Sequence, residues 1–495
     1  MTRPEEETAV TDLKSLLSDP DLLRTDAYLA GEWTAGAAGT FAVDDPATGE
    51  VIARVADCDR ADAARAIEAA AAAQKAWAAR TAKDRAQVLR AWFDAMMAAQ
   101  DDLAAILTAE QGKPLAEAKG EIAYGASFVE FFAEEAKRVR GEIIPGHMPD
   151  KRLHVIRQPI GVVGSITPWN FPNAMITRKV APALAAGCAV VARPASETPL
   201  SALALGVLAD RAGLPKGVLS ILPASDASGF GLELCENDLV RKLTFTGSTQ
   251  VGRILLAQAA DRVMKCSMEL GGNAPFVVFD DADLDAAVEG AIACKFRNNG
   301  QTCVCANRLY VQSGIHDAFV AKLAERVDAL RTGPGMEGSD LGPLINAKGL
   351  EKVERHVADA RAKGATVVTG GERHPAGPNF YAATIVTGAT KEMAFATEET
   401  FGPLAPIFRF DTVEEAIALA NNTIFGLAAY FYARDLSLVT RMSEALEYGI
   451  VGVNTGIIST EMAPFGGVKQ SGLGREGSHL GIEEYLEAKY VCLSV

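Results

Sequence analysis

Ile160-Gly161-Val162-Val163-Gly164-Ser165-Ile166 is a short apolar run, followed by a helix-like segment near 174–186 and a second apolar run at 189–192. The alternation continues with β-prone runs at 218–222, 242–246 and 263–268 and helical segments near 201–211 and 250–260. Strand-like runs that alternate with helices predict a parallel, doubly wound α/β sheet.

The pattern extends on both sides of this region. Residues 59–100 are alanine-rich with helical spacing, and Asp59 or Asp62 can cap a helix there. After residue 283, β-prone runs at 308–311, 366–368 and 404–410 alternate with helices and end near 452–454. Because 495 residues exceed one ordinary hydrophobic core, we interpret this second stretch as another domain.

The C-terminal run 490–495 is β-prone, which predicts pairing with another strand or another subunit.

Two helix starts are candidate phosphate sites, at Thr198-Pro199 and at Gly247-Ser248-Thr249. The first offers a cap and a first-turn proline, and the second directly follows a predicted strand. We expect that both helix starts can receive a phosphate group.

Composition narrows the class of protein. The chain has 48 basic and 63 acidic residues, a net charge of −15, and no basic block, which disfavours nucleic acid and anionic membranes as partners. The longest apolar run, 180–192, is shorter than the roughly 18 residues of a membrane span, and Pro182 and Gly187 interrupt it. The acidic N-terminus does not resemble a secretory signal.

The cysteines point to a reducing compartment, and the histidines give no indication of a metal site. The eight cysteines are scattered without the spacing of a disulfide framework, so we expect a cytoplasmic protein. The six histidines show no metal-ligand spacing, and no metal is predicted.

Three short motifs carry the chemistry. Cys303 lies in Gly300-Gln301-Thr302-Cys303-Val304-Cys305, where a glycine turn can present a thiolate to a substrate. Glu269 precedes Leu270-Gly271-Gly272 at a predicted chain reversal, and Asn170 is bracketed by Pro168 and Pro172. Taken singly, these residues are a core thiol, a solvated carboxylate and a turn asparagine; taken together they suggest covalent catalysis with an amide donor for an oxyanion.

These motifs resemble those of the aldehyde dehydrogenase superfamily. Further matches lie at Lys179 and at three stretches: 245–248, 399–403 and 464–472. The resemblance implies an α/β fold with a Rossmann-type cofactor domain (1–141 and 160–270), a catalytic domain (271–470) and a small β oligomerisation element (142–159 and 471–495). It also implies a homodimer or homotetramer.

The resemblance assigns a role to each catalytic residue. Cys303 attacks the aldehyde to form a thiohemiacetal, Asn170 and the Cys303 backbone N–H hold the oxyanion, and Glu269 activates water to hydrolyse the thioester. Lys179 assists proton movement or orients the cofactor. The implied cofactor residues are Ile166, Thr167, Pro168, Trp169, Arg193, Ser196, Gly247, Ser248, Gly252, Glu399 and Phe401.

The cofactor is NADP or NAD, and the sequence favours NADP. No Gly-x-Gly-x-x-Gly fingerprint lies in the region of alternating strands and helices that begins at residue 160. Where the family has a Lys-Pro-x-Glu stretch at the adenine-side ribose, this chain has Arg193-Pro194-Ala195-Ser196. Ser196 removes a carboxylate that would repel a 2′-phosphate, and Arg193 adds a planar donor. In the alternative, Arg193 only substitutes for the lysine, and NAD is preferred.

Within the superfamily the chain resembles the succinate-semialdehyde dehydrogenases, through 170–179, 295–305 and 454–459. The resemblance implies that Arg178, Arg297 and Ser459 grip the distal carboxylate of a small carboxylated aldehyde. The arginines taken singly are equally typical of surface or domain-pairing cations.

Three alternatives stay open. Glutarate semialdehyde or another short ω-carboxylated aldehyde uses the same arginines. A non-catalytic binding protein on the same scaffold is the reading from another class. Finally, Cys305 is either a redox partner that closes a reversible disulfide with Cys303, as similar enzymes do, or a small buried residue.

Overall fold

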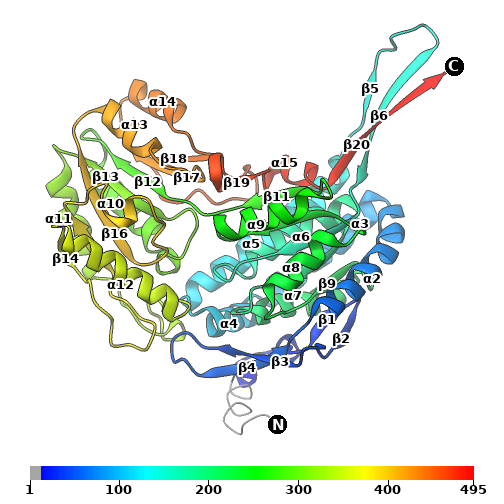
Figure 1. The fold of residues 1–495 in the computed structure, drawn as a ribbon, viewed down its shortest axis with the longest axis horizontal. Helices are drawn as coiled ribbons and strands as arrows, with labels where there is room; N and C mark the ends of the chain where they lie inside the picture. Colours follow the sequence, from blue (N-terminus) through cyan, green and yellow to red (C-terminus); the bar gives the residue numbers. More distant parts are fainter. Residues whose placement is uncertain (1–12) are drawn as a thin grey trace.

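Two open sheets organise the chain, and Figure 1 shows them beside each other with a long arm leaving the body. The computed structural model describes residues 13–495. The first sheet has the order β19-β11-β10-β7-β8-β9-β1-β2, and the second has the order β14-β15-β16-β13-β12-β17-β18. The predicted α/β fold is confirmed.

The first sheet has a parallel centre with a short antiparallel strand or pair at each edge. Its strands are β1 (Ala27–Leu29), β2 (Glu32–Thr34), β7 (Val162–Ile166), β8 (Ala189–Arg193), β9 (Leu219–Ile221), β10 (Val240–Thr246), β11 (Lys265–Glu269) and β19 (Gly472–Leu473). The central pairs β7–β8 and β7–β10 are parallel, and β7 and β8 are buried throughout. Burial on both faces explains why these strands read as continuous apolar runs.

Helices cover both faces of the first sheet. One hydrophobic core includes residues of α3 (Ala82–Ala98), α4 (Gln100–Gln111), α5 (Leu115–Glu135), α6 (Ala174–Ala186) and α7 (Pro199–Arg211). The other includes residues of α2 (Arg60–Ala79), α8 (Ala227–Glu236) and α9 (Thr249–Ala260). The sheet is therefore doubly wound, as the alternation of runs predicts.

The second sheet repeats this arrangement. Its strands are β12 (Ala274–Val278), β13 (Ala306–Gln312), β14 (Thr366–Thr369), β15 (Thr384–Thr387), β16 (Leu404–Phe410), β17 (Ala428–Tyr432) and β18 (Ile450–Val453). Its first core includes α10 (Leu284–Lys295) and α11 (His316–Asp328). Its second core includes α12 (Ala347–Ala362), α13 (Val413–Asn421) and α14 (Leu436–Ala445).

Several local predictions need correction. The helical region 59–100 is two helices, because the chain is extended at Arg80 and Thr81 caps α3. Val263, predicted in a strand, lies in a turn with φ 51° and is 91% exposed. Asp59 caps α2 as predicted, in a capping box with Asp62.

The start of α7 does not receive a phosphate as predicted. The Glu110 carboxylate accepts hydrogen bonds from Leu200 N (2.7 Å) and Ser201 N (2.8 Å), whereas the Thr198 side chain makes no capping bond. Burial raises the pKa of Glu110 to about 8. A buried carboxyl group therefore occupies the helix start that the sequence leaves open.

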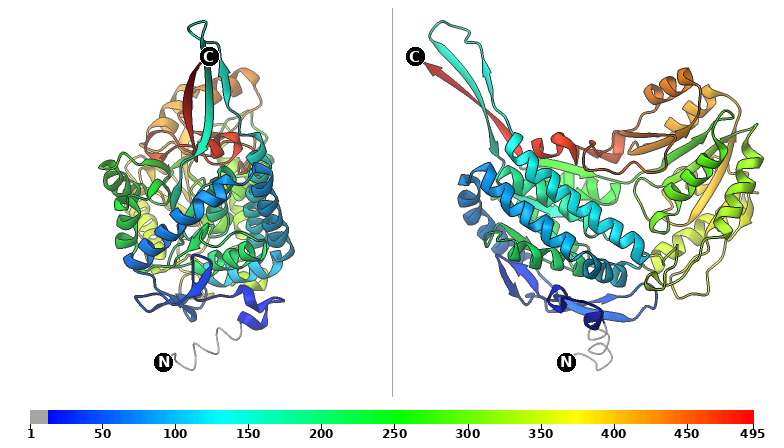
Figure 2. Two further views of the ribbon diagram at one scale, coloured as in Figure 1. Left: turned by 90° about the vertical axis from the view of Figure 1, so that its right-hand side faces the viewer. Right: turned by 180° about the vertical axis from the view of Figure 1, so that it is seen from behind.

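The arm is a three-stranded antiparallel sheet of β5 (Glu142–Ile144), β6 (Lys151–Pro159) and β20 (Leu486–Ser494), and both views in Figure 2 show it extending beyond the body. The C-terminal run thus pairs with β6 of its own chain, with Tyr490 opposite Val155. β20 is an edge strand, and it exposes Tyr490, Leu493 and Val495 with the end of the chain.

The remaining elements connect these units: the hairpin β3 (Thr40–Asp44) with β4 (Val51–Ala56), and the short helix α15 (Ser478–Glu483) beside α5 and α6. The division into three domains stays a prediction. Within residues 13–495, no helix is long and apolar enough to cross a membrane. The same residues contain no group of three His, Cys, Asp or Glu that is able to hold a metal ion.

Candidate active site

Asn170 lies in the loop between β7 and α6, at the carboxyl end of the parallel strands, where open α/β sheets bind their ligands. Its side chain is buried, and Nδ2 donates to the Gln301 carbonyl at 3.0 Å. The Asn170 carbonyl accepts from Lys113 Nζ (2.8 Å) and from Asn298 Nδ2 (2.9 Å). Because an amide nitrogen carries two hydrogens, Nδ2 keeps one donor for a ligand.

A buried ion pair holds this loop, and our sequence analysis missed it. Lys113 Nζ lies 2.6 Å from Glu121 Oε2, and both side chains are 1% exposed. Glu121 Oε1 accepts from the backbone N–H groups of Asn173 (3.0 Å) and Ala174 (3.2 Å) at the start of α6. The carboxylate stabilises the helix start, and the ammonium group fixes the carbonyl of Asn170.

Cys303 follows a tight turn, as predicted. Asn298 and Asn299 in that turn have φ values of 50° and 55°, a conformation that asparagine tolerates better than most residues. The Cys303 thiol is half-buried, and burial raises its pKa to about 12 although Arg178 opposes the shift. The turn places the predicted nucleophile at the edge of a cavity, and a pKa raised this far keeps the thiol protonated at neutral pH.

Glu269 is the last residue of β11. It is buried and lines the cavity that Cys303 and Asn170 also line. Burial and the nearby Glu476 raise the pKa of its carboxyl well above the ordinary value. Oε2 has no hydrogen-bond partner within residues 13–495. A carboxyl group with a raised pKa and an unused oxygen suits a general base.

Glu476 joins Lys179 to Arg178. Lys179 Nζ bonds Oε1 of this carboxylate, and Arg178 Nη2 lies 2.8 Å from Oε2. Burial raises the pKa of Glu476, but Lys179 and Arg178 outweigh burial and hold that pKa below its usual value. Our sequence analysis missed Glu476, although two adjacent cations in the apolar helix α6 are a signal that a carboxylate must approach them.

The predicted substrate residues come together at one cavity. Arg178, Arg297, Ser459 and Cys303 line a space of about 280 Å³, together with Tyr124, Phe171 and Phe465. Arg178 stacks on Phe465 at 4.0 Å from the ring centroid, and Arg297 lies 5.6 Å from the Phe171 centroid.

The two arginines differ in their partners. Arg178 is paired with Glu476, whereas no carboxylate within residues 13–495 forms an ion pair with Arg297. Glu117 also lines the cavity and accepts from Asn298 N at 2.8 Å, and burial raises its pKa. Arg297 is therefore the cation best able to meet an incoming anion.

A second cavity of about 350 Å³ shares Cys303 and Arg178 with the first. Six predicted cofactor residues line it: Pro168, Trp169, Gly247, Ser248, Glu399 and Phe401. Ser248 caps α9, so a helix start opens here, and such a start favours a phosphate. Thr246 Oγ1 is a buried polar atom without a partner in the described chain, which fits a polar ligand.

Glu399 is fixed beside this cavity by Gly272, whose N–H donates to Oε1 at 3.3 Å. Burial raises the pKa of Glu399 to about 7. Lys352 and Asn346 line the same space and were missed by our sequence analysis. Together these residues contribute polar groups to the lining of the cavity.

The sequence model of the aldehyde dehydrogenase family matches residues 33–491. The chain belongs to the aldehyde dehydrogenase family. A glutarate-semialdehyde dehydrogenase of Pseudomonas aeruginosa is 62% identical over 479 residues, which cover 96% of this chain and 99% of that one. The NADP(+) succinate-semialdehyde dehydrogenase of Escherichia coli K12 is 60% identical and covers 97% and 100%.

A solved structure of succinate-semialdehyde dehydrogenase from Burkholderia pseudomallei superposes with a TM-score of 0.96, at 60% identity over 97% of this chain and 100% of that one. The prediction of an NAD(P)-dependent aldehyde dehydrogenase of the semialdehyde dehydrogenase type is confirmed.

Five predicted cofactor residues of this aldehyde dehydrogenase do not line the 350 Å³ cavity: Ile166, Thr167, Arg193, Ser196 and Gly252. Arg193 is buried and Nη2 donates to the Ala224 carbonyl at 2.8 Å, while Ser196 Oγ contacts the Glu197 carboxylate at 3.4 Å. Gly252 packs against Leu270, since a Cβ there would approach Leu270 Cδ2 to 2.4 Å.

Cys305 is buried, and its thiol lies 3.4 Å from Lys295 Nζ. Burial raises the pKa of this thiol, although Lys295 opposes the shift. All eight cysteines of the aldehyde dehydrogenase are free thiols in the structure. The disulfide between Cys303 and Cys305 stays a prediction.

Proposed function

We propose that this aldehyde dehydrogenase oxidises succinate semialdehyde to succinate. The observation that carries the proposal is the position of Arg297: a cation without a carboxylate partner in the described chain, in one cavity with Ser459 and the nucleophile Cys303. A guanidinium group binds a carboxylate in two-point geometry. The E. coli relative, which is named as a succinate-semialdehyde dehydrogenase, supports the assignment.

The residues of the chain divide the reaction between them. The Cys303 sulfur adds to the aldehyde carbon as the thiol releases its proton to solvent, and Asn170 Nδ2 with the Cys303 N–H stabilises the oxyanion of the thiohemiacetal. A nicotinamide cofactor, held beside Glu399 and Phe401, would supply the hydride acceptor, and loss of hydride from this carbon would give the thioester. Glu269 then takes a proton from water, and attack of the resulting hydroxide on the thioester releases the acid and the Cys303 thiolate, which regains a proton from Glu269.

Glutarate semialdehyde is the second candidate, favoured by the 62% identical relative. One extra methylene changes binding by only about 1–3 kcal/mol. A nicotinamide absorbance assay with ω-carboxylated aldehydes of increasing length, and with butanal as the uncharged control, discriminates the candidates. We expect the highest kcat/KM for succinate semialdehyde; a maximum at butanal would contradict a carboxylate grip.

For the cofactor, we propose NADP. Ser196 and Arg193 replace the glutamate and lysine that the family uses at the adenine-side ribose, and the E. coli relative carries NADP(+) in its name. The bond from Arg193 Nη2 to the Ala224 carbonyl leaves Nε without a hydrogen-bond partner in the described chain. Comparing kcat/KM for the two cofactors tests this, and a tenfold preference for NAD defeats it.

For assembly, we propose a homodimer or homotetramer in the cytoplasm. The arm presents an edge strand with exposed Tyr490, Leu493 and Val495, and such an edge readily pairs with another copy. Eight free thiols suit a reducing compartment. Light scattering after size exclusion measures the mass, and a monomer would contradict the assembly.

A further inference from the structure

Glu399 and Phe401 lie on a segment, 394–401, that runs between the second sheet and α12. We propose that Asn307 and His356 are positioning residues for the cofactor, because they hold this segment so that Glu399 and Phe401 line the cavity. The inference rests on the proposed role of Glu399 in cofactor binding. Neither Asn307 nor His356 lines the cavity itself.

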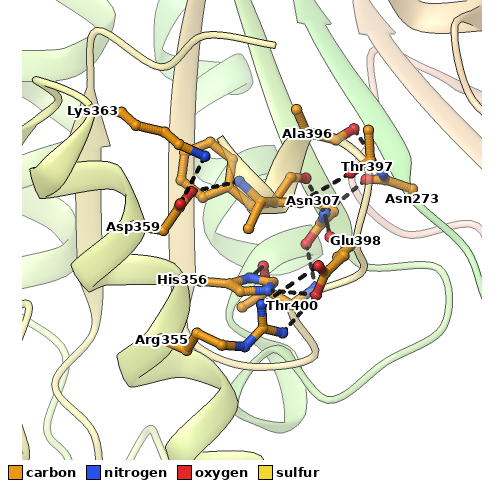
Figure 3. Close-up of polar contacts among 12 residues, drawn as sticks. Asn273, Asn307, Arg355, His356, Asp359, Lys363, Ala396, Thr397, Glu398 and Thr400 are labelled. Carbon is orange, nitrogen blue, oxygen red and sulfur yellow. Dashed lines mark hydrogen bonds and ion pairs between the residues drawn. The ribbon is translucent and has the colours of Figure 1, made fainter. Parts of the chain in front are cut away.

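Asn307, on β13, uses every polar atom of its side chain on the segment or its support (Figure 3). Nδ2 contacts the carbonyls of Phe395 (3.1 Å) and Glu398 (3.0 Å), and also Asn273 Oδ1 (2.7 Å). Oδ1 accepts from Thr400 N at 2.9 Å. One buried amide thus fixes the backbone on both sides of Glu399.

Asn273 reinforces this contact from the strand β12 side. Its Nδ2 donates to the Ala396 carbonyl at 3.1 Å, while its Oδ1 accepts from Asn307. Both asparagines are buried, so an unmade bond here carries its full desolvation cost. The two amides therefore determine each other's orientation.

His356 holds the segment from the opposite side, on α12. Nδ1 lies 3.1 Å from Thr400 Oγ1 and Nε2 lies 3.3 Å from Glu398 Oε2. Arg355 adds an ion pair of 2.6 Å to the same Glu398 carboxylate. In Figure 3 the helix side chains and the two asparagines point toward the segment from different sides.

The segment needs such support because its conformation is unfavourable by itself. Phe401 has φ 59°, a left-handed conformation that a bulky side chain rarely adopts. Its ring meets that of Trp169 edge to face, with 5.5 Å between the centroids, and both residues line the cavity. Thr397 and Glu398 are exposed, so little apolar packing holds this part of the segment. The polar side chains of Asn273, Asn307, Arg355 and His356, which we call the clamp, hold it instead.

The clamp is separate from the nucleophile's surroundings. Within residues 13–495, Asn307 and His356 make no hydrogen bond with Cys303, Glu269 or Asn170. We therefore expect a looser clamp to weaken cofactor binding much more than it changes the reactivity of the thiol, to which Glu399 contributes only one of several nearby charges. A general loss of structure changes both, and this difference makes the inference testable.

The experiment compares full-length Asn307→Ser, His356→Ala, His356→Asn and His356→Gln with wild type. It measures KM and Kd for NADPH and NADP, KM for succinate semialdehyde, the rate of Cys303 alkylation by iodoacetamide without cofactor, and Tm. In Asn307→Ser and His356→Ala we expect cofactor KM and Kd to rise about tenfold, the worth of one or two hydrogen bonds. Aldehyde KM and alkylation stay within about twofold.

The conservative variants add a rescue. An Asn amide reaches the place of Nδ1 and a Gln amide that of Nε2, so His356→Asn restores the Thr400 contact and His356→Gln the Glu398 contact. We expect His356→Asn to recover more cofactor affinity, because Thr400 adjoins both Glu399 and Phe401. If Asn307→Ser does not fold, the three His356 variants carry the test.

Two matched controls lie elsewhere in the second domain. Asn421 also clamps backbone in two directions, to the Ala445 carbonyl and from Glu447 N, and His316 is a buried histidine with two polar partners. Asn421→Ser and His316→Asn should lower Tm without changing cofactor Kd. Equal changes of cofactor Kd in controls and clamp variants overturn the inference.

Glu399→Gln separates this inference from the proposed function. If Glu399→Gln leaves cofactor Kd unchanged, the assigned role of Glu399 is wrong. If Glu399→Gln weakens the cofactor but Asn307→Ser and His356→Ala do not, the role stands and the positioning inference is wrong.

Discussion

The two arginines of the 280 Å³ cavity differ in which charged side chains already pair with them. Arg178 lies at an inner end with Lys179, Glu476 and Glu269, where buried charges compensate one another. Arg297 and Ser459 are only half-buried, and we call their side of the cavity the outer end; Glu117 lines the same cavity, but no carboxylate of the described chain forms an ion pair with Arg297. The same residue type is therefore committed to the protein at one end and available to a ligand at the other.

This difference divides the tasks of the cavity. A buried cation that a carboxylate already holds contributes mainly to the protonation states around it, whereas an uncompensated cation favours an anionic ligand. The sequence suggests one role for both arginines, namely gripping the distal carboxylate. We expect Arg178 to affect catalysis on every aldehyde and Arg297 to affect only carboxylated ones.

The largest effect is expected at the inner end. Arg178→Ala leaves Glu476 with Lys179 alone and removes a cation that lowers the pKa of Cys303, so kcat/KM falls for both succinate semialdehyde and butanal, by about 100-fold or more. Steady-state kinetics with both aldehydes measure this. A loss confined to succinate semialdehyde would show that Arg178 only grips the carboxylate.

At the outer end, Arg297→Ala removes the available cation. We expect KM for succinate semialdehyde to rise about 10- to 100-fold, the worth of a charge-assisted bidentate contact, while butanal kinetics stay within about twofold. Arg297→Lys is the matched control, since it keeps the charge but not the two-point geometry. Equal losses on both aldehydes contradict the division of the cavity.

The pH dependence sharpens the description of the inner end. The pKa of Glu269 is raised by burial and by Glu476, and the base form is the ionised one, so thioester hydrolysis accelerates with pH through that raised value, about tenfold per unit below it. The free energy of unfolding changes in the opposite direction. Because the folded protein raises the pKa of Glu269, the stability contributed by its protonated form is lost as pH rises through the folded-state pKa. A kcat profile of wild type against Glu269→Gln, whose profile should be low and flat, checks this.

The features that depend on short stretches of sequence could be predicted: buried strands and the motifs that contain the candidate catalytic residues. The buried strands β7 and β8 read as apolar runs, and the motifs around Asn170, Glu269 and Cys303 identify the residues that line the cavity. What the sequence does not predict is the pairing of buried charges over long distances. Glu110 at the start of α7 and Glu476 between Lys179 and Arg178 depend on the completed fold, since nothing in their neighbouring residues specifies those partners.

The smallest effect on basal activity is expected at Cys305, which belongs to neither end of the cavity because its thiol faces Lys295. Cys305→Ala should keep kcat/KM within about twofold, as expected for a small buried side chain. If Cys305 closes a reversible disulfide with Cys303, peroxide inactivates wild type in a way that a thiol reverses, and the variant does not recover. Equal recovery of wild type and Cys305→Ala would exclude the switch. The peroxide reaction would then involve Cys303 without Cys305.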